Sequence, residues 1–313
     1  MAIKKRTREA MDIGRRLAAE ILKRRNAALR TRAAALRAHP KLISLRIQAI
    51  HRGIPAAKAT MVQTAGVLVA EGDSWFDYPF HDVLKELEDN HGYDVKSVAR
   101  KGDPIEEMAY GDSQLDDFTR LLDGLLRNGV TPKAILLSGG GNDVVGDEFG
   151  MLVNHARSSI AGLNDDVLKG VIDQRIERAY GVIVSALTHI CQDRVGKPLP
   201  ILVHGYDYPV PDGRGFMGGW WLLPGPWLEP GFREKGFGDL SPCIQMAHDL
   251  IDRFNRMLAG VAAQFQYVRY IDLRNTLSTG RNYKDWWANE LHPTPQGWSR
   301  VAARFAAVLQ MLP

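Results

Sequence analysis

The chain has 313 residues, of which 45% are hydrophobic and 24% charged, and its formal net charge is +4. This composition is typical of a globular protein, and the length accommodates one large α/β domain with an extension or two smaller domains. No run approaches the roughly 18 apolar residues of a membrane span, and no apolar signal-peptide segment follows the basic N-terminus. Cys191 and Cys243 show neither metal-site nor disulfide spacing, so we expect two buried thiols in a soluble, cytoplasmic protein.

Residues 1–64 read as a basic helical extension. Of the 40 Lys and Arg residues, 16 lie at or before residue 58, where only three acidic residues occur, so the rest of the chain is acidic. Ala18, Ile21, Leu22 and Leu29 recur at roughly helical spacing among strong helix formers. The pattern predicts one or two amphipathic helices that end near residues 39–40 and again near residues 53–55.

Three roles are open for this extension. Its helices could dock on the acidic body, with or without self-association; they could bind an anionic partner through residues 1–58; or they could lie on an anionic membrane surface. The stretch contains no aromatic residue, which disfavours stacking on single-stranded nucleic acid. We therefore expect no specific nucleic-acid partner.

From residue 65 the chain alternates between apolar runs and helical patterns. Residues 66–71 form an apolar run bounded by Gly72, which is typical of a buried parallel strand. Further strands are expected at 93–98, 134–138, 200–204 and 268–272, and helices at 83–90, 115–127, 164–192, 243–265 and 295–312. The alternation predicts a three-layer α/β/α sandwich around a parallel five-stranded sheet, with ligands bound where the strands end.

Polar and glycine-containing clusters follow three of these strands, and an imidazole precedes the last helix. The four segments are Gly72-Asp73-Ser74, Lys101-Gly102-Asp103, Gly141-Asn142-Asp143 and His292-Pro293. Each one alone is typical of a turn or a helix cap. Because the carboxyl ends of parallel strands share one edge of the sheet, their occurrence in this order predicts a common site.

In these four segments the sequence resembles the SGNH hydrolases, also called the GDSL esterase/lipase family, over residues 66–313. The resemblance implies a flavodoxin-like fold and an esterase mechanism in which Ser74 attacks the ester carbonyl and His292 is the general base. It further implies an oxyanion hole made by the backbone N–H groups of Ser74 and Gly102 and by the side-chain amide of Asn142. No metal and no organic cofactor is implied.

One position departs from the family pattern. The family usually places an aspartate three residues before the histidine, where this chain has Asn289. Three explanations stay open: a Ser–His pair with Asn289 as orienter, replacement of the acid by Glu290 through a shifted loop, or an inactivating change at position 289. The choice matters because loss of a triad carboxylate can cost about 10⁴-fold in turnover.

A Gly-, Pro- and Trp-rich insertion at about residues 206–240 emerges at the predicted catalytic edge. It is too long for a simple connection, so it is expected to form a lid or a binding wall, with a purely structural loop as the alternative. The side chains expected to bind substrate are Trp75, Asp103, Tyr206, Trp220, Trp221 and Trp287.

The sequence thus predicts a serine ester hydrolase acting on a small-molecule, glycan or lipid ester through an acyl-serine intermediate. A first alternative keeps the family and makes the protein a carbohydrate O-acetylesterase. A second, from another class, is a weakened pseudo-esterase that works as a binding protein through its basic N-terminal helices.

Overall fold

The computed structural model describes residues 5–38, 64–111, 113–218 and 223–313, with side chains in the first segment described up to residue 31. Its centre is a sheet of five strands, all parallel to their neighbours. In spatial order the strands are β2 (Asp94–Ser97), β1 (Val67–Glu71), β3 (Ala134–Leu137), β6 (Ile201–His204) and β7 (Val268–Ile271). A second, antiparallel pair joins β4 (Val153–Asn154) and β5 (Gly162–Leu163).

The register of the sheet brings the strand ends to one level. Glu71 at the end of β1 pairs with Leu137 at the end of β3, and Leu137 in turn pairs with Val203 of β6. Every residue of β3 and β6 is buried, as expected for central parallel strands that are covered on both faces. The segments after β1, β3 and β6 therefore all begin at the same edge.

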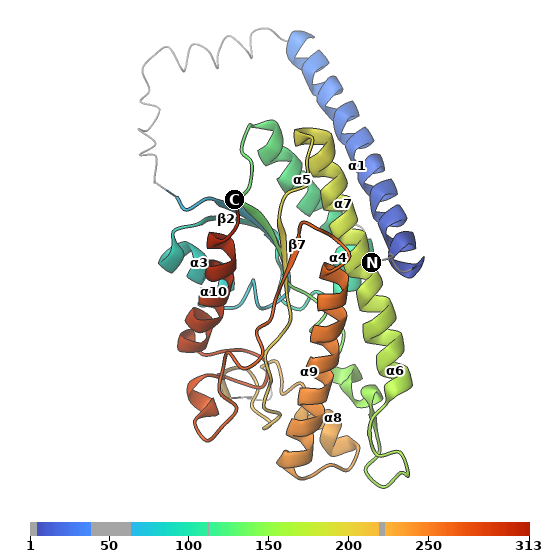
Figure 1. Ribbon diagram of the computed structural model, residues 1–313, viewed down its shortest axis with the longest axis vertical. Coiled ribbons are helices and arrows are strands. Elements are labelled where there is room, and N and C mark those ends of the chain that lie inside the picture. The colour runs from blue at the N-terminus through green and yellow to red at the C-terminus, as the bar shows by residue number, and fades with distance from the viewer. Residues whose placement is uncertain (1–4, 39–63, 112, 219–222) are drawn as a thin grey trace.

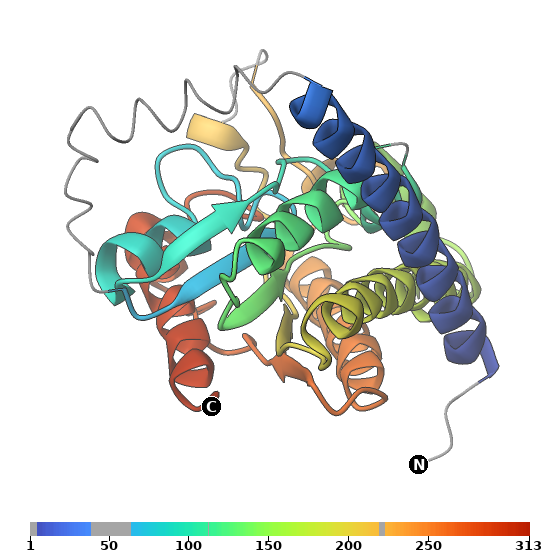
Figure 2. The same ribbon diagram turned by 90° about the horizontal axis from the view of Figure 1, so that it is seen from above.

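Helices cover both faces of the sheet. One face carries α3 (Val83–His91) and α10 (Pro295–Gln310), which pack against each other, and the other carries most of the remaining helices (Figure 1). Seen from above, the sheet lies between these two layers (Figure 2). The second layer contains α4 (Ile105–Tyr110), α5 (Gln114–Arg127), α7 (Glu177–Val195) and α9 (Leu240–Ala262).

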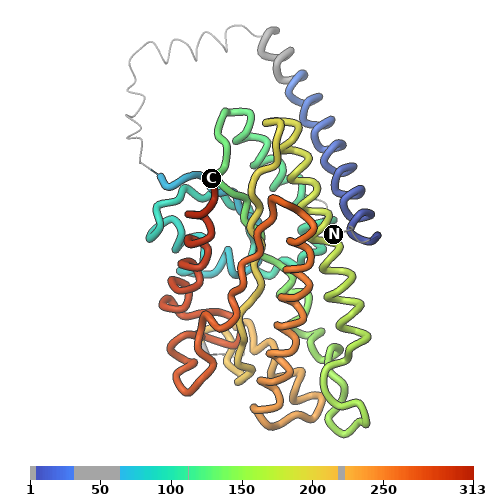
Figure 3. The backbone as a smooth tube through the Cα atoms, viewed as in Figure 1, coloured from blue at the N-terminus to red at the C-terminus, as the bar shows by residue number. Residues whose placement is uncertain are grey.

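Shorter elements lie around this frame. Helix α6 (Asp165–Gly170) continues through a π-helical turn at Val171–Ile176 into α7. Helix α8 (Glu229–Glu234) lies in the insertion, and 3₁₀ turns occur at Gly146–Leu152, Phe216–Gly218 and Tyr283–Asp285. In the tube view of Figure 3 the segment that follows β6 and the segment that precedes α10 lie together at the lower end of the molecule.

Helix α1 (Lys5–Ala38) lies along the outer side of α7 (Figures 1 and 2). Its buried face consists of small and aliphatic side chains, among them Ala10, Ala18 and Ile21. The two backbones approach so closely that a Cβ at Gly14 would lie 2.3 Å from the carbonyl oxygen of Val182. The apolar face of α1 is thus used within the chain, and its charged face stays exposed.

The predicted three-layer α/β/α sandwich with a five-stranded parallel sheet is confirmed. The expected continuous helix at 164–192 is wrong in detail, because a π-helical turn interrupts it. Helix α4 and the β4–β5 pair were not expected from the sequence, and the second helical stretch expected after residue 40 lies outside the described residues. No described helix is both long and apolar enough to cross a membrane.

Candidate active site

The segment after β1 presents Ser74 at the edge of the sheet. The carbonyl of Asp73 accepts hydrogen bonds from the backbone N–H groups of Phe76 and Asp77, so the chain turns as soon as the strand ends. Gly72 permits this turn, since a Cβ there would lie 2.7 Å from the Cβ of Ser138 on the neighbouring segment. Ser74 itself stays partly exposed.

Ser74 and His292, 218 residues apart in sequence, meet across the edge of the sheet. The hydroxyl oxygen of Ser74 lies 2.8 Å from His292 Nε2, and His292 Nδ1 lies 3.0 Å from the side-chain oxygen of Asn289. That oxygen also accepts the backbone N–H groups of Leu291 and His292, which identifies it as the carbonyl end of the amide. Nδ1 must therefore carry the proton, and the Nε2 lone pair faces the serine.

Tyr78 completes the surroundings of the imidazole. Its ring stacks on His292 at a centroid distance of 4.1 Å and an interplanar angle of 20°, and its hydroxyl accepts a hydrogen bond of 3.0 Å from the Asn289 amide nitrogen. His292 is only 5% exposed, and this burial lowers its pKa from 6.5 to about 3. The histidine is consequently neutral at physiological pH, the form that a general base requires.

Three residues that offer hydrogen-bond donors, Ser74, Gly102 and Asn142, line the same cavity. Among the described residues, the backbone N–H groups of Ser74 and Gly102 have no partner. The Asn142 amide nitrogen donates one hydrogen to the carbonyl of Asp103 at 3.1 Å, which fixes the side chain and leaves its second hydrogen available. Gly102 has φ +89°, a left-handed backbone conformation that favours glycine.

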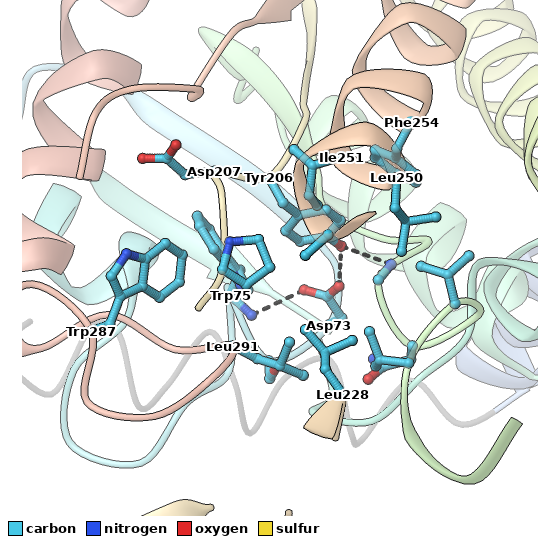
Figure 4. A pocket seen from close by; sticks show the side chains of 17 residues that line it. Asp73, Trp75, Tyr206, Asp207, Leu228, Leu250, Ile251, Phe254, Trp287 and Leu291 are labelled. Carbon is cyan, nitrogen blue, oxygen red and sulfur yellow. Dashed lines mark hydrogen bonds between the residues drawn. The ribbon is translucent and has the colours of Figure 1, made fainter. Parts of the chain in front are cut away.

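A buried carboxylate, that of Asp73, ties the strand ends together. It accepts hydrogen bonds from the backbone N–H of Trp75 and the hydroxyl of Tyr206, as Figure 4 shows, and also from the hydroxyl of Ser138. The Tyr206 hydroxyl in turn accepts the backbone N–H of Gly141. Segments that follow β1, β3 and β6 are thereby held in one arrangement, which preorganises both the serine and the Asn142 loop.

Glu290 holds the insertion against the histidine segment. Its carboxylate, which is fully buried, accepts backbone N–H groups from four residues of the insertion: Gly213, Trp227, Leu228 and Glu229. Burial raises the pKa of Glu290, and these four bonds oppose that rise. The expectation that Glu290 replaces the missing acid is therefore corrected: its oxygens are committed to the insertion, and Asn289 is the residue that contacts His292.

Two cavities adjoin the serine. The narrow cavity has a volume of about 50 Å³, and its walls are mainly apolar. It is lined by Trp75, Val144, Tyr206, Leu250, Ile251, Phe254 and Trp287, several of which are drawn in Figure 4. The wide cavity has a volume of about 330 Å³ and is lined by Tyr78, Lys101, Gly102, Phe216, Trp227 and His292. Ser74, Asn142 and Leu291 border both.

Comparisons with known proteins give structural likenesses only. No family model matches the chain, and no curated protein matches its sequence. An extracellular lipase from Streptomyces rimosus has 16% identity over 80% of this chain and 100% of its own, with a TM-score of 0.46. A candidate SGNH hydrolase from Slackia heliotrinireducens has 14% identity over 77% and 97%, with a TM-score of 0.44. A variant of an acetyl-xylooligosaccharide esterase from Geobacillus stearmophilus has 12% identity over 79% and 95%, with a TM-score of 0.40.

The solved structures that resemble this chain thus include SGNH hydrolases, lipases and esterases, all at low identity. The described residues hold no group of three or more His, Cys, Asp or Glu side chains suited to a metal ion.

The predicted substrate-binding residues divide into three sets. Trp75, Tyr206 and Trp287 are buried and line the narrow cavity. Asp103 lines neither cavity; its carboxylate contacts Gln114, and its carbonyl holds Asn142. Trp220 and Trp221 lie outside the described residues.

Phe216 and Trp227 belong to the insertion that the sequence predicts to form a lid or a binding wall, and both line the wide cavity. Several other residues that line the cavities were missed from the sequence: Tyr78, Leu291 and the α9 residues Ala247, Leu250, Ile251 and Phe254. The α9 residues have the helical periodicity of any core-facing helix, so no local signal separates a cavity wall from ordinary core. For Tyr78 the only available signal was its position four residues after the serine.

Proposed function

We propose that this chain is a serine hydrolase that cleaves carboxylic esters through an acyl-Ser74 intermediate. The observation that carries the proposal is the 2.8 Å contact between the Ser74 hydroxyl and a neutral His292 whose Nδ1 proton is held by Asn289. A serine hydroxyl is a weak nucleophile until an adjacent base can accept its proton, and this arrangement supplies that base.

The reaction begins when Ser74 Oγ forms a bond to the ester carbonyl carbon while its proton moves to His292 Nε2. The carbonyl oxygen becomes an oxyanion beside the N–H groups of Ser74 and Gly102 and the Asn142 amide. Each preorganised donor of this kind contributes about 3–4 kcal/mol to stabilising the transition state. When the carbon–oxygen bond of the ester breaks, His292 returns the proton to the leaving alkoxide, and the alcohol departs.

Deacylation repeats these steps with water. A water molecule gives its proton to His292 Nε2 as its oxygen attacks the acyl carbon, and the proton then passes to Ser74 Oγ as the acyl–serine bond breaks. Asn289 cannot neutralise the imidazolium that forms in each half-reaction. The Tyr78 ring, stacked on the imidazole, supplies a cation–π interaction in its place, worth about 0.5–2 kcal/mol.

The first test is hydrolysis of p-nitrophenyl acetate by the wild type and by Ser74→Ala. The proposal predicts turnover above the buffer rate in the wild type and loss of at least about 10³-fold in the variant. A folded wild type without turnover, in which Asn289→Asp restores activity, would favour the pseudo-esterase alternative.

A further inference from the structure

The two cavities differ in which of the proposed catalytic residues line them: Gly102 and His292 line only the wide one. Both border Ser74 and Asn142, so both reach the carbon that the serine attacks. His292 lines the wide cavity and is absent from the walls of the narrow one. Besides the oxyanion and the Ser74 oxygen, the tetrahedral intermediate carries two substituents, the acyl chain and the leaving alcohol, and each of the two cavities can hold one of them.

We infer that the narrow cavity takes the acyl group and the wide cavity the alcohol, so that the substrate is a short-chain acyl ester of a ring-bearing alcohol. The inference rests on the proposed function. Because His292 Nε2 has to give its proton to the leaving oxygen, that oxygen has to lie on the side of His292, which is the wide cavity. The narrow cavity is then the space left for the acyl chain.

The size of the narrow cavity limits the acyl chain. A cavity needs about 10–15 Å³ of free volume to hold one water molecule. The volume of about 50 Å³ thus holds roughly three to five atoms of that size, which corresponds to acyl groups of about two to four carbons. Leu250, Ile251 and Phe254 of α9 form its wall, and Phe254 is itself packed against the Tyr206 ring. Longer chains would have to displace this packed helix.

The wide cavity has the walls of a ring-binding site. The ring centroids of Tyr78 and Phe216 lie 5.8 Å apart in an edge-to-face arrangement, and those of Trp227 and His292 lie 5.4 Å apart at an interplanar angle of 72°. Aromatic side chains of this kind pack against rings, either the plane of an aryl group or the apolar face of a sugar. The Glu290 carboxylate fixes Trp227 through its backbone N–H, so this wall is preformed.

The acyl half is tested with p-nitrophenyl esters from acetate to dodecanoate. The wild type is expected to favour acetate to butyrate over octanoate by at least about tenfold in kcat/KM. Leu250→Ala should raise the octanoate-to-acetate ratio by about tenfold or more, and Ala247→Val should lower the butyrate-to-acetate ratio. The matched control is Leu258→Ala, a buried α9 residue outside the cavity wall, which should leave both ratios unchanged.

The alcohol half is tested with acetate esters of different alcohols. Phe216→Ala should raise KM for phenyl acetate, for an O-acetylated xyloside, or for both, while leaving KM for ethyl acetate within about twofold. A rise confined to one of the ring esters tells whether the ring is aryl or sugar. Equal effects on ethyl acetate and both ring esters would contradict the assignment of the wide cavity.

Labelling of Ser74 by a small fluorophosphonate distinguishes a wrong assignment of the two cavities from a wrong proposal of hydrolase activity. A protein that is labelled and active, yet prefers octanoate or shows no shift in Leu250→Ala, overturns the cavity assignment and leaves the hydrolase intact. A protein that is neither labelled nor active on any ester overturns the hydrolase and, with it, the assignment.

Discussion

The side-chain carbonyl of Asn289 lies 3.0 Å from His292 Nδ1, in the place where the resemblance led us to expect a carboxylate. The amide holds the imidazole in the tautomer that a general base needs, and Tyr78 fixes the amide in turn by accepting its N–H. The Asn289 side chain therefore orients the His292 imidazole without carrying a negative charge. In enzymes with a Ser-His-Asp triad, loss of the acid is costly because the histidine takes the wrong tautomer. An amide that holds the correct tautomer keeps part of the acid's contribution.

Two substitutions of Asn289 measure separately how much orientation of the His292 imidazole and a negative charge beside it contribute to turnover. Asn289→Ala removes the acceptor of the Nδ1 proton, and we expect kcat to fall about 10–100-fold, in line with the loss of one buried hydrogen bond of about 1–3 kcal/mol. Asn289→Asp keeps the acceptor and adds a negative charge beside the imidazolium, so we expect turnover to rise about tenfold. Steady-state kinetics on p-nitrophenyl acetate measure both. Unchanged turnover in Asn289→Ala would show that the contact has no role.

Tyr78 can be dissected in the same way. Tyr78→Phe keeps the stacked ring and loses the hydroxyl that orients Asn289, whereas Tyr78→Leu loses the ring. A cation–π interaction of about 0.5–2 kcal/mol corresponds to roughly 2–30-fold in rate, so we expect the larger loss of kcat in Tyr78→Leu. Asn289→Asp introduced into Tyr78→Leu should restore much of that loss, since the carboxylate stabilises the same cation. Equal losses of kcat in Tyr78→Phe and Tyr78→Leu would contradict a contribution of the Tyr78 ring to stabilising the imidazolium.

The pH dependence of the reaction follows from the burial of His292. Its pKa is lowered to about 3, so the neutral base persists through the mildly acidic range. We predict that kcat/KM stays level from about pH 8 to about pH 5 and falls only toward pH 3. A decline centred near the ordinary histidine value of 6.5 would contradict this account.

The same burial couples His292 to stability. The folded pKa lies below the unfolded value, so in the range between them the unfolded chain binds more protons than the folded one. The contribution of His292 to stability is therefore complete above about pH 6.5 and is lost progressively as the pH falls toward 3. Circular dichroism across this range, recorded with the kinetics, distinguishes protonation of the base from unfolding.

Glu290→Gln tests whether this residue acts through the insertion. In the glutamine variant an NH₂ group takes the place of one carboxylate oxygen and faces backbone N–H groups that can no longer be accepted. Each group left without a partner lowers the free energy of unfolding by about 1–3 kcal/mol. We expect a lower Tm and a higher KM with an unchanged pH profile, because the carboxylate contacts the insertion and not His292. Glu148→Gln, at an exposed position, is the control. If the acidic side of the pH profile of kcat/KM shifts in Glu290→Gln, Glu290 is instead the carboxylate that assists His292.

The packing of α1 on α7 is tested at Gly14. A valine there would drive its Cβ into the Val182 carbonyl, and overpacking of this kind costs about 1–3 kcal/mol. A loss of about 2–4 °C in Tm is expected for each kcal/mol. Ala19→Val, on the exposed face of the same helix, should leave Tm unchanged. Both variants should keep kcat within about twofold, because no side chain described for α1, up to residue 31, lines either cavity. A Gly14→Val protein as stable as the wild type would mean that the helix does not pack as described.

The sequence predicted the elements whose signal is local. The buried run ahead of Gly72 and the glycine and asparagine at the ends of β2 and β3 could be placed because parallel strands end at a common edge. The identity of the orienting residue could not be predicted, since Asn289 and Glu290 are neighbours that point to different partners. The roles of Tyr78 and Leu250 could not be predicted either, because they come from packing between segments that are distant in sequence and not from their own neighbourhood.

Whether His292 makes Ser74 a reactive nucleophile is measured by covalent labelling of the folded wild-type protein with a small fluorophosphonate, followed by peptide mass spectrometry. We predict one label per chain, on Ser74, and no label in His292→Ala, since the serine needs the base to react. No label on a folded wild type, or a label on another residue, would contradict it.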